Sequence, residues 1–152
     1  MLPTPSRAPL LKEHPDHHDA EIVLRVYELR TEAVMRESRA AINKDFWPRS
    51  WEEVQAVMKG DHPLNAPFRQ TSSYWEMVYG FARHGIVNAD FLLESNGEGL
   101  LLFARIKPFL QQYRAATNPH AFRNAEWIAT QSEVGRQRMV GLDARIAKAM
   151  QS

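Results

Sequence analysis

The sequence predicts an all-α protein: a single compact, bundle-like domain of five to seven helices, with a Pro-rich N-terminal arm and a polar C-terminal helix. Apolar residues recur at steps of three and four through most of the chain, which is the period of one helix face. Few stretches alternate with the two-residue period of a strand. The chain has 152 residues, of which 44% are hydrophobic and 24% charged, and these values suit one globular domain.

The first predicted helix is the longest. We expect it to begin near Asp16 or Asp19, because acidic side chains are favourable at the positive end of a helix dipole. Its apolar stripe can continue to about Lys44. Trp47-Pro48 should end it, since proline disfavours helix at the preceding residue.

The next two helices have clear end signals. Ser50 opens a capping box, S-x-x-E, which predicts a short helix over 51–59. A clean apolar stripe over 68–82 then predicts a third helix that is largely buried. Gly85 should end it in the left-handed conformation that glycine adopts after a helix.

Shorter helices are expected in the second half. Asn88 is a good N-cap for a short helix, and the turn at 96–99 should end that helix. Pro108 should kink the fifth helix or delay its start to about 107. Asn118 and Pro119 are predicted to be the N-cap and the first residue of the sixth helix. The apolar positions expected in these last two helices are Leu102, Ile106, Phe109, Tyr113, Phe122, Ala125 and Ile128.

These signals divide the chain into three parts. Residues 1–15 are expected to form an irregular arm, and 16–131 the helical body. Apolar residues thin out over 132–152, so we expect an exposed helical tail there. That tail belongs either to the same domain or to an arm used in oligomer formation.

Composition narrows the classes of function. With 19 Lys and Arg against 18 Asp and Glu, the net charge is +1, whereas nucleic-acid binders usually carry a clear basic excess. The absence of cysteine excludes disulfides, thiol catalysis and thiolate metal sites. No run of about 18 apolar residues occurs, so no transmembrane segment is expected. We expect a cytoplasmic protein with no cofactor and no nucleic-acid partner.

The start of the first helix holds the residues that could ligate a metal: His14, His17, His18 and Asp19. Imidazole and carboxylate groups are good ligands for zinc and similar ions. Adjacent histidines point in different directions on a helix, however, and this spacing matches no known ligand pattern. His18-Asp19 resembles the HD dyad of metal-dependent phosphohydrolases, but the histidine well upstream in that family is missing. We predict neither a metal site nor a catalytic residue.

Three other residues could form an interaction surface. Trp47, Arg49 and Trp51 surround a loop instead of continuing a helical stripe. Exposed aromatic rings next to arginine are common anchors in protein interfaces. The simpler interpretation, which carries more weight, is that these rings cover the end of the bundle.

Several segments resemble a family of uncharacterised bacterial proteins, domain of unknown function 4760. The resemblance would cover about 18–130 and implies a bacterial source and a helical fold, with no activity or catalytic residue to transfer. The segments that carry it are EIVLRVYELR at 21–30, VMR at 34–36, YWEMV at 74–78, RHGIVN at 83–88, IKPF at 106–109 and YR at 113–114.

Three functions are consistent with these observations. The favoured one is a non-enzymatic interaction or regulatory module that binds a protein, including the case of a homodimer. The second is a metal-dependent hydrolase that uses the N-terminal His and Asp residues. The third is a small-ligand binder with an interhelical pocket walled by Trp75, Tyr79 and Phe109.

Overall fold

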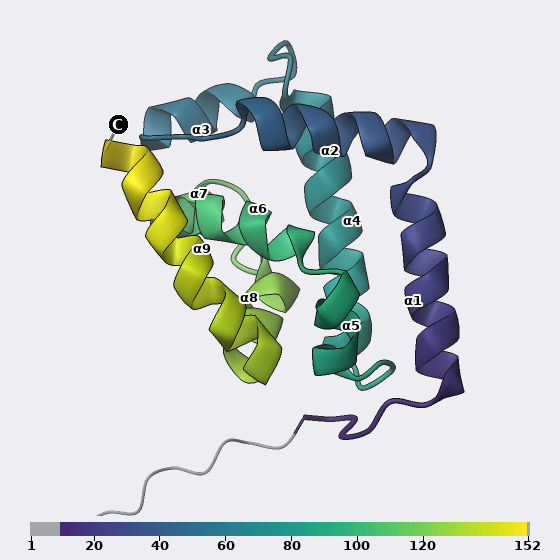
Figure 1. Ribbon diagram of the computed structural model, residues 1–152. Helices are drawn as coiled ribbons and strands as arrows, with labels where there is room; N and C mark the ends of the chain where they lie inside the picture. Colours follow the sequence, from purple (N-terminus) through teal and green to yellow (C-terminus); the bar gives the residue numbers. More distant parts are fainter. Residues whose placement is uncertain (1–9, 152) are drawn as a thin grey trace, which may run out of the picture.

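The computed structural model describes residues 10–151, which form helices without any strand (Figure 1). The all-α prediction is confirmed, but the described part of the chain contains more helices than the five to seven expected. Residues 1–9 of the expected arm lie outside the described residues, and 10–16 are not helical. The elements are α1 His17–Arg30, α2 Ala33–Asp45, α3 Trp51–Val57, α4 Asn65–Arg83, α5 Ala89–Ser95, α6 Glu98–Ile106, the 3-10 helix η1 Lys107–Phe109, α7 Leu110–Ala116, α8 Arg123–Gln131 and α9 Glu133–Gln151.

The helices surround one core. In Figure 1, α2 and α3 lie across one end, and α1, α4 and α9 run away from that end with α6, α7 and α8 between α4 and α9. Helix α4 packs against α2 and α8, while α9 packs against α6 and α8. Val78, Tyr79, Leu100 and Ile128 are fully buried where these helices meet. Among residues 10–151, no helix has both the length and the apolar character needed to cross a bilayer.

The prediction of a single long first helix is wrong, because α1 ends at Arg30 and the chain turns there into a separate helix, α2. The Thr31 N–H donates to the carbonyls of Tyr27 and Glu28, which ends α1. The Glu32 carboxylate then accepts from the Met35 N–H at 3.4 Å and caps α2. No glycine or proline marks this corner, so its only local signal is a glutamate in the capping position.

Three predicted helix ends are confirmed. The Ser50 hydroxyl accepts from the Glu53 N–H at 3.2 Å, and the Asn88 side chain accepts from the Phe91 N–H at 2.8 Å. Gly85 follows the C-cap of α4 and has a φ of 75°, in the left-handed region, as predicted for the residue that ends this helix. Each of these signals acts within a few residues of its own position, which is why the sequence shows it.

Helix α6 begins inside the glycine-containing turn instead of after it, at Glu98. The Arg39 side chain of α2 reaches this first turn, with Nε–Oε1 and Nη2–Oε2 distances to Glu98 of 2.6 and 2.7 Å. Its Nη1 also donates to the Arg30 carbonyl at 2.9 Å. The ion pair therefore joins α1, α2 and α6. Pro108 lies in η1, which separates α6 from α7 and agrees with the predicted interruption.

The predicted start of the sixth helix is wrong. The Asn118 side chain accepts from the His120 N–H at 2.8 Å and forms a turn, and α8 begins only at Arg123. Phe122 precedes α8 in the left-handed conformation, with φ of 59°. The first N–H groups of α8 are capped from α4, because the Glu76 carboxylate accepts from Asn124 and Ala125 at 3.1 and 2.7 Å.

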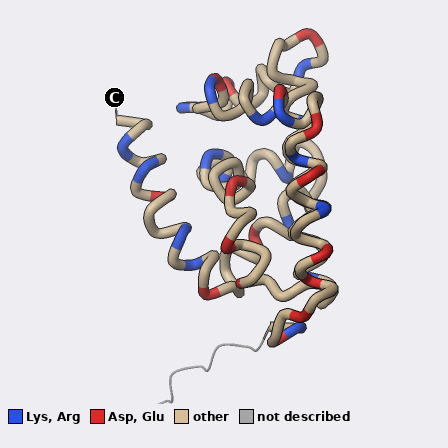
Figure 2. The backbone as a smooth tube through the Cα atoms, turned by 45° about the vertical axis from the view of Figure 1, so that its right-hand side comes forward, with Lys and Arg blue, Asp and Glu red and all other residues tan. Residues whose placement is uncertain are grey.

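Helix α9 follows α8 after Ser132. The tail is helical, as expected, but it is not simply exposed, because Gly135, Met139 and Ile146 are buried against the body. A Cβ on Gly135 would lie 2.4 Å from the Ile128 carbonyl oxygen, so the two helices meet closely there. The remaining face carries four basic residues against two acidic ones, and Figure 2 shows the Lys and Arg spread along the helix.

Candidate binding site

The N-terminal histidines do not converge. His14, His17 and His18 are exposed, and the rings of His17 and His18 lie 4.0 Å apart at their centroids. Asp19 is fully buried instead. Within residues 10–151 no three His, Asp or Glu side chains are grouped as metal ligands would be.

Asp19 fixes the N-terminal segment to the body. Its carboxylate accepts from Lys12 Nζ at 2.5 Å and from the Asn88 N–H at 2.9 Å. The Asn88 side-chain amide in turn donates to the Lys12 carbonyl at 2.8 Å. Each of these hydrogen bonds joins two parts of the chain, so we assign the group a structural role.

The predicted aromatic pocket is filled by its own walls. Trp75 and Tyr79 are buried and stacked, with ring centroids 5.6 Å apart. A Cβ on Gly99 would lie 2.6 Å from the Tyr79 hydroxyl, so no room separates α4 from α6 at this point. Phe109 is also buried. These residues belong to the core.

The loop between α2 and α3 leads to a cavity. Trp47 is half-buried, and its indole N–H donates to the Asn43 carbonyl at 2.9 Å. The loop lies against the last turns of α9 and leaves a cavity of about 240 Å³ between them. Among the described residues, its lining consists of Trp47, Pro48, Arg49, Arg105, Ile146, Ala149 and Met150. Two of the three residues predicted as an interaction surface therefore line one cavity, while Trp51 is partly buried beside them.

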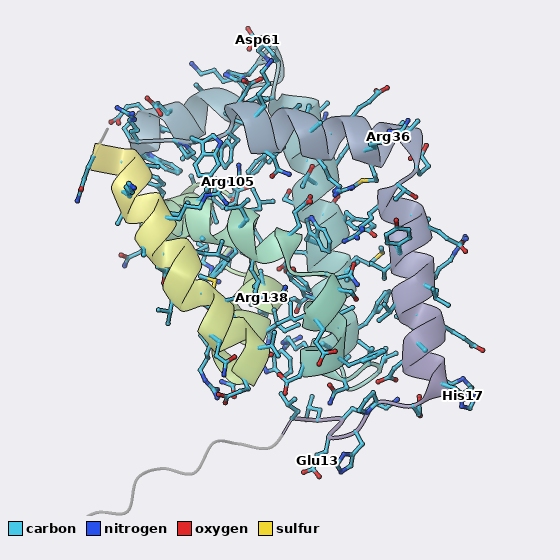
Figure 3. All side chains as sticks on the ribbon, in the orientation of Figure 1. Glu13, His17, Arg36, Asp61, Arg105 and Arg138 are labelled. Carbon is cyan, nitrogen blue, oxygen red and sulfur yellow. The ribbon has the colours of Figure 1, made fainter. Side chains whose placement is uncertain are left out.

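Arg105 is the residue that the sequence did not reveal. It is only 2% exposed, although the part of α6 around it is apolar. Its Nη1 donates to the carbonyls of Ile42 and Phe46 at 2.8 and 2.9 Å, and its Nη2 to the Asn43 side chain at 3.1 Å. The guanidinium thus completes the C-terminus of α2 from another helix. Figure 3 shows it inside the molecule, near α9.

Within the described part of the chain, the charge of Arg105 is in no ion pair, although the Glu98 carboxylate acts electrostatically to raise its pKa. Burial lowers its pKa to about 10, which still leaves the group protonated at neutral pH. No carboxylate of residues 10–151 lies within ion-pair distance of it. Its acceptors are dipoles, which offset only part of a full charge.

A second guanidinium lies near Trp47. Arg105 is 4.8 Å and Arg145 of α9 is 5.2 Å from the centroid of the indole ring. Such cation–π contacts hold a flat ring and a charge in one geometry. We call Trp47, Arg49, Trp51, Arg105 and the α9 residues Arg145, Ile146, Ala149 and Met150 the Trp47 corner.

Two other hollows differ in charge and burial. A hollow of about 220 Å³, which Trp47 and Pro48 also line, includes Asp45, Glu53 and His62. A hollow of about 480 Å³ between α4 and α8 contains Arg83 and Arg123 but no buried charged side chain. The cavity at Arg105 is thus the one of the three that combines a buried cation with apolar walls.

Comparison with the curated proteins and with the solved structures gives no match. A family model does match, over residues 15–132, which is most of the chain and includes Trp47, Arg49 and Arg105. Helix α9, which closes the cavity, follows the matched range. The chain belongs to the family described as Domain of unknown function (DUF4760).

Proposed function

We propose that this protein is a non-enzymatic binding module that recognises an acidic segment of a partner protein at the Trp47 corner. The observation that carries the proposal is Arg105, a buried guanidinium that lines a cavity and has no carboxylate partner in the described chain. A buried charge without a counter-ion is unfavourable and attracts an anion. We also propose a bacterial, cytoplasmic setting, which rests on the bacterial family resemblance and the lack of cysteine.

Charge and side-chain type favour a protein over a nucleic acid. Tryptophan and arginine are enriched among the residues that dominate protein interfaces. The chain's net charge of +1 is also small for a protein that binds a phosphate backbone.

The other two functions find less support in the geometry. His17 and His18 are exposed whereas Asp19 is buried and bonded to Lys12 and Asn88, so a hydrolase centre at that place would need a rearrangement. At the expected aromatic pocket, Trp75 and Tyr79 are buried and Gly99 of α6 packs directly against both rings. Neither site has a buried charge that lacks a counter-ion.

Binding of a labelled acidic peptide tests the proposal. The peptide carries alternating Glu and Leu and a C-terminal amide, and its control has Gln for each Glu. We expect the acidic peptide to bind and the Gln peptide to bind at least about tenfold more weakly. Arg145→Gln should weaken binding by about two- to fivefold, because it removes one charge at the rim of the site.

Arg123→Gln on α8 is the matched control, since Arg123 is exposed and lines a different hollow. It should leave peptide binding unchanged at equal salt. Equal binding of both peptides would contradict the proposal. So would tighter binding of a single-stranded oligonucleotide, or a homodimer, detected by sedimentation, that Trp51→Ala dissociates.

A further inference from the structure

We infer that the cavity at Arg105 is a pocket for the chain-terminal carboxylate of a peptide whose last residue is aliphatic. The inference rests on the proposed function and specifies which group of the partner enters the Trp47 corner. It follows from three properties of the cavity: its lining has a cationic and an apolar part, one of its charges is held in place, and its volume is small.

The walls divide into a cationic part and an apolar part. Arg49 and Arg105 provide the cationic part, and no acidic side chain lines the cavity among the described residues. Ile146, Ala149 and Met150 of α9 provide the apolar part. A ligand that satisfies both parts must carry an anion and an aliphatic group only a few bonds apart.

Arg105 is held in position before any ligand arrives. Nη1 uses both of its N–H groups on backbone carbonyls, and Nε donates to the Leu101 carbonyl at 3.2 Å. Nη2 donates once, to Asn43. A guanidinium has five N–H groups, so one on Nη2 has no acceptor within residues 10–151. A charge that is already fixed loses little conformational entropy when it binds an anion.

The size of the cavity limits the ligand. A volume of about 240 Å³ corresponds to roughly eight water molecules at about 30 Å³ each, enough for one residue but not for a folded element. An internal Asp or Glu offers a carboxylate without a separate aliphatic side chain. A C-terminal Leu or Val carries both groups on one Cα, so it fits both parts of the wall. Backbone and charged groups that capture chain termini are a known mode of peptide recognition.

The pocket can be tested with two small probes that differ only in charge. N-acetyl-leucine has the free carboxylate, and N-acetyl-leucinamide has the same shape without it. Trp47, Trp51, Trp75 and Trp127 give four indole N–H signals in a ¹⁵N spectrum, and Trp47→Phe identifies the signal of Trp47. We expect N-acetyl-leucine to shift the Trp47 signal and leave Trp75 unmoved. The amide should bind at least about tenfold more weakly.

A filled cavity gives a variant test that keeps Arg105. Ala149→Leu places additional carbons into the cavity lining, and it should abolish the shift caused by N-acetyl-leucine. Ala147→Leu is the matched control, because Ala147 is exposed on the same helix and does not line the cavity. It should bind the probe like the wild type, with helical content unchanged by circular dichroism in both variants.

Three results would overturn the inference: equal shifts with both probes, full competition by inorganic phosphate at equal concentration, or normal binding by Ala149→Leu. The amidated Glu/Leu peptide separates this failure from failure of the proposed function. If that peptide binds while N-acetyl-leucine does not, the proposed binding of an acidic segment is supported and the inferred pocket for a terminal carboxylate is contradicted. If neither ligand binds, both fall.

Discussion

Among the described residues two charged side chains are buried, Asp19 near the start of α1 and Arg105 of α6 at the C-terminus of α2, and their surroundings differ. Asp19 is fully buried and meets the ammonium group of Lys12 and the N–H of Asn88. Arg105 is buried to nearly the same degree and meets two carbonyls and an amide oxygen. The anion contacts its counter-ion directly, whereas the cation's hydrogen bonds within the described chain all go to carbonyl and amide dipoles.

This difference separates a structural charge from one that can still act on a ligand. The hydrogen bonds of the Asp19 carboxylate are all made to other residues of the protein, so we assign it no ligand. Arg105 is also structural, since it completes the end of α2, but its positive charge remains only partly offset beside a cavity. Four changes, ordered by expected effect on stability, test the comparison.

The largest effect is expected for Arg105→Met. Methionine fills similar space but leaves the Ile42 and Phe46 carbonyls without their donor, and each buried unsatisfied group costs about 1–3 kcal/mol. We expect the free energy of unfolding, measured by urea denaturation, to fall by about 3 kcal/mol. Arg105→Lys keeps the charge with fewer donors and should lose less. A wild-type midpoint for Arg105→Met would show that the guanidinium does not hold α2.

A smaller loss is expected for Asp19→Ala. The substitution leaves the buried Asn88 N–H without an acceptor, so stability should fall by about 2 kcal/mol in the same assay. Asp19→Asn keeps an acceptor and should lose less than Asp19→Ala. Lys12→Met leaves the fully buried Asp19 carboxylate without its counter-ion, so it should also lower the free energy of unfolding. A wild-type midpoint for Lys12→Met would show that the Asn88 N–H alone offsets the charge of Asp19.

Glu98 should make stability depend on pH in the acid range. Burial alone would raise its pKa, but the hydrogen bonds and charge of Arg39 lower that pKa below its ordinary value of 4.5. The pair therefore stabilises the fold above about pH 4.5, and the contribution is lost as the pH falls through the lowered pKa. Glu98→Gln should lose about 1 kcal/mol at pH 7.

Denaturation curves of wild type and Glu98→Gln between pH 7 and pH 3 check this sign. The difference between the two should be largest at neutral pH and shrink as the pH falls. A difference that grows toward acid pH would contradict it. Because both proteins retain Glu76, whose pKa burial raises, the subtraction removes the opposite pH effect of that residue.

The smallest expected effect is a gain in stability, from a substitution in α9, the helix that lines the cavity. Gly141 lies within α9, and a Cβ there would meet no atom within 4 Å. Gly141→Ala should raise the free energy of unfolding by about 0.5–1 kcal/mol, because alanine restricts the unfolded chain and favours helix. The midpoint of thermal unfolding should rise, with N-acetyl-leucine affinity unchanged. A lower midpoint would show that the exposed face of α9 has a contact that glycine alone permits.

The sequence predicted what local chemistry determines. Ser50, Asn88 and Gly85 act through bonds to residues close in the chain, and all three were found as predicted. The break after Arg30 and the delayed start of α8 were missed. Glu76 caps α8 from 48 positions away, a bond that no local pattern contains.

The site divides in the same way. Trp47 and Arg49 stand out in the sequence because aromatic and basic residues lie next to a proline in a loop. Arg105 stands out only as a charge in an apolar stripe, and its role depends on α2 being packed beside it. The apolar residues of α9 were too sparse to show that the helix would cover this loop.

The bond between Arg105 and α2 has a consequence for the order of assembly. The two carbonyls that it holds lie 63 and 59 positions earlier in the chain. During synthesis, α2 and Trp47 in the loop after it are complete long before Arg105 is made, and contacts across such separations form later than local caps. No N-terminal fragment that stops before α6 and α9 can contain this site, so the pocket arises only after α9 has been made.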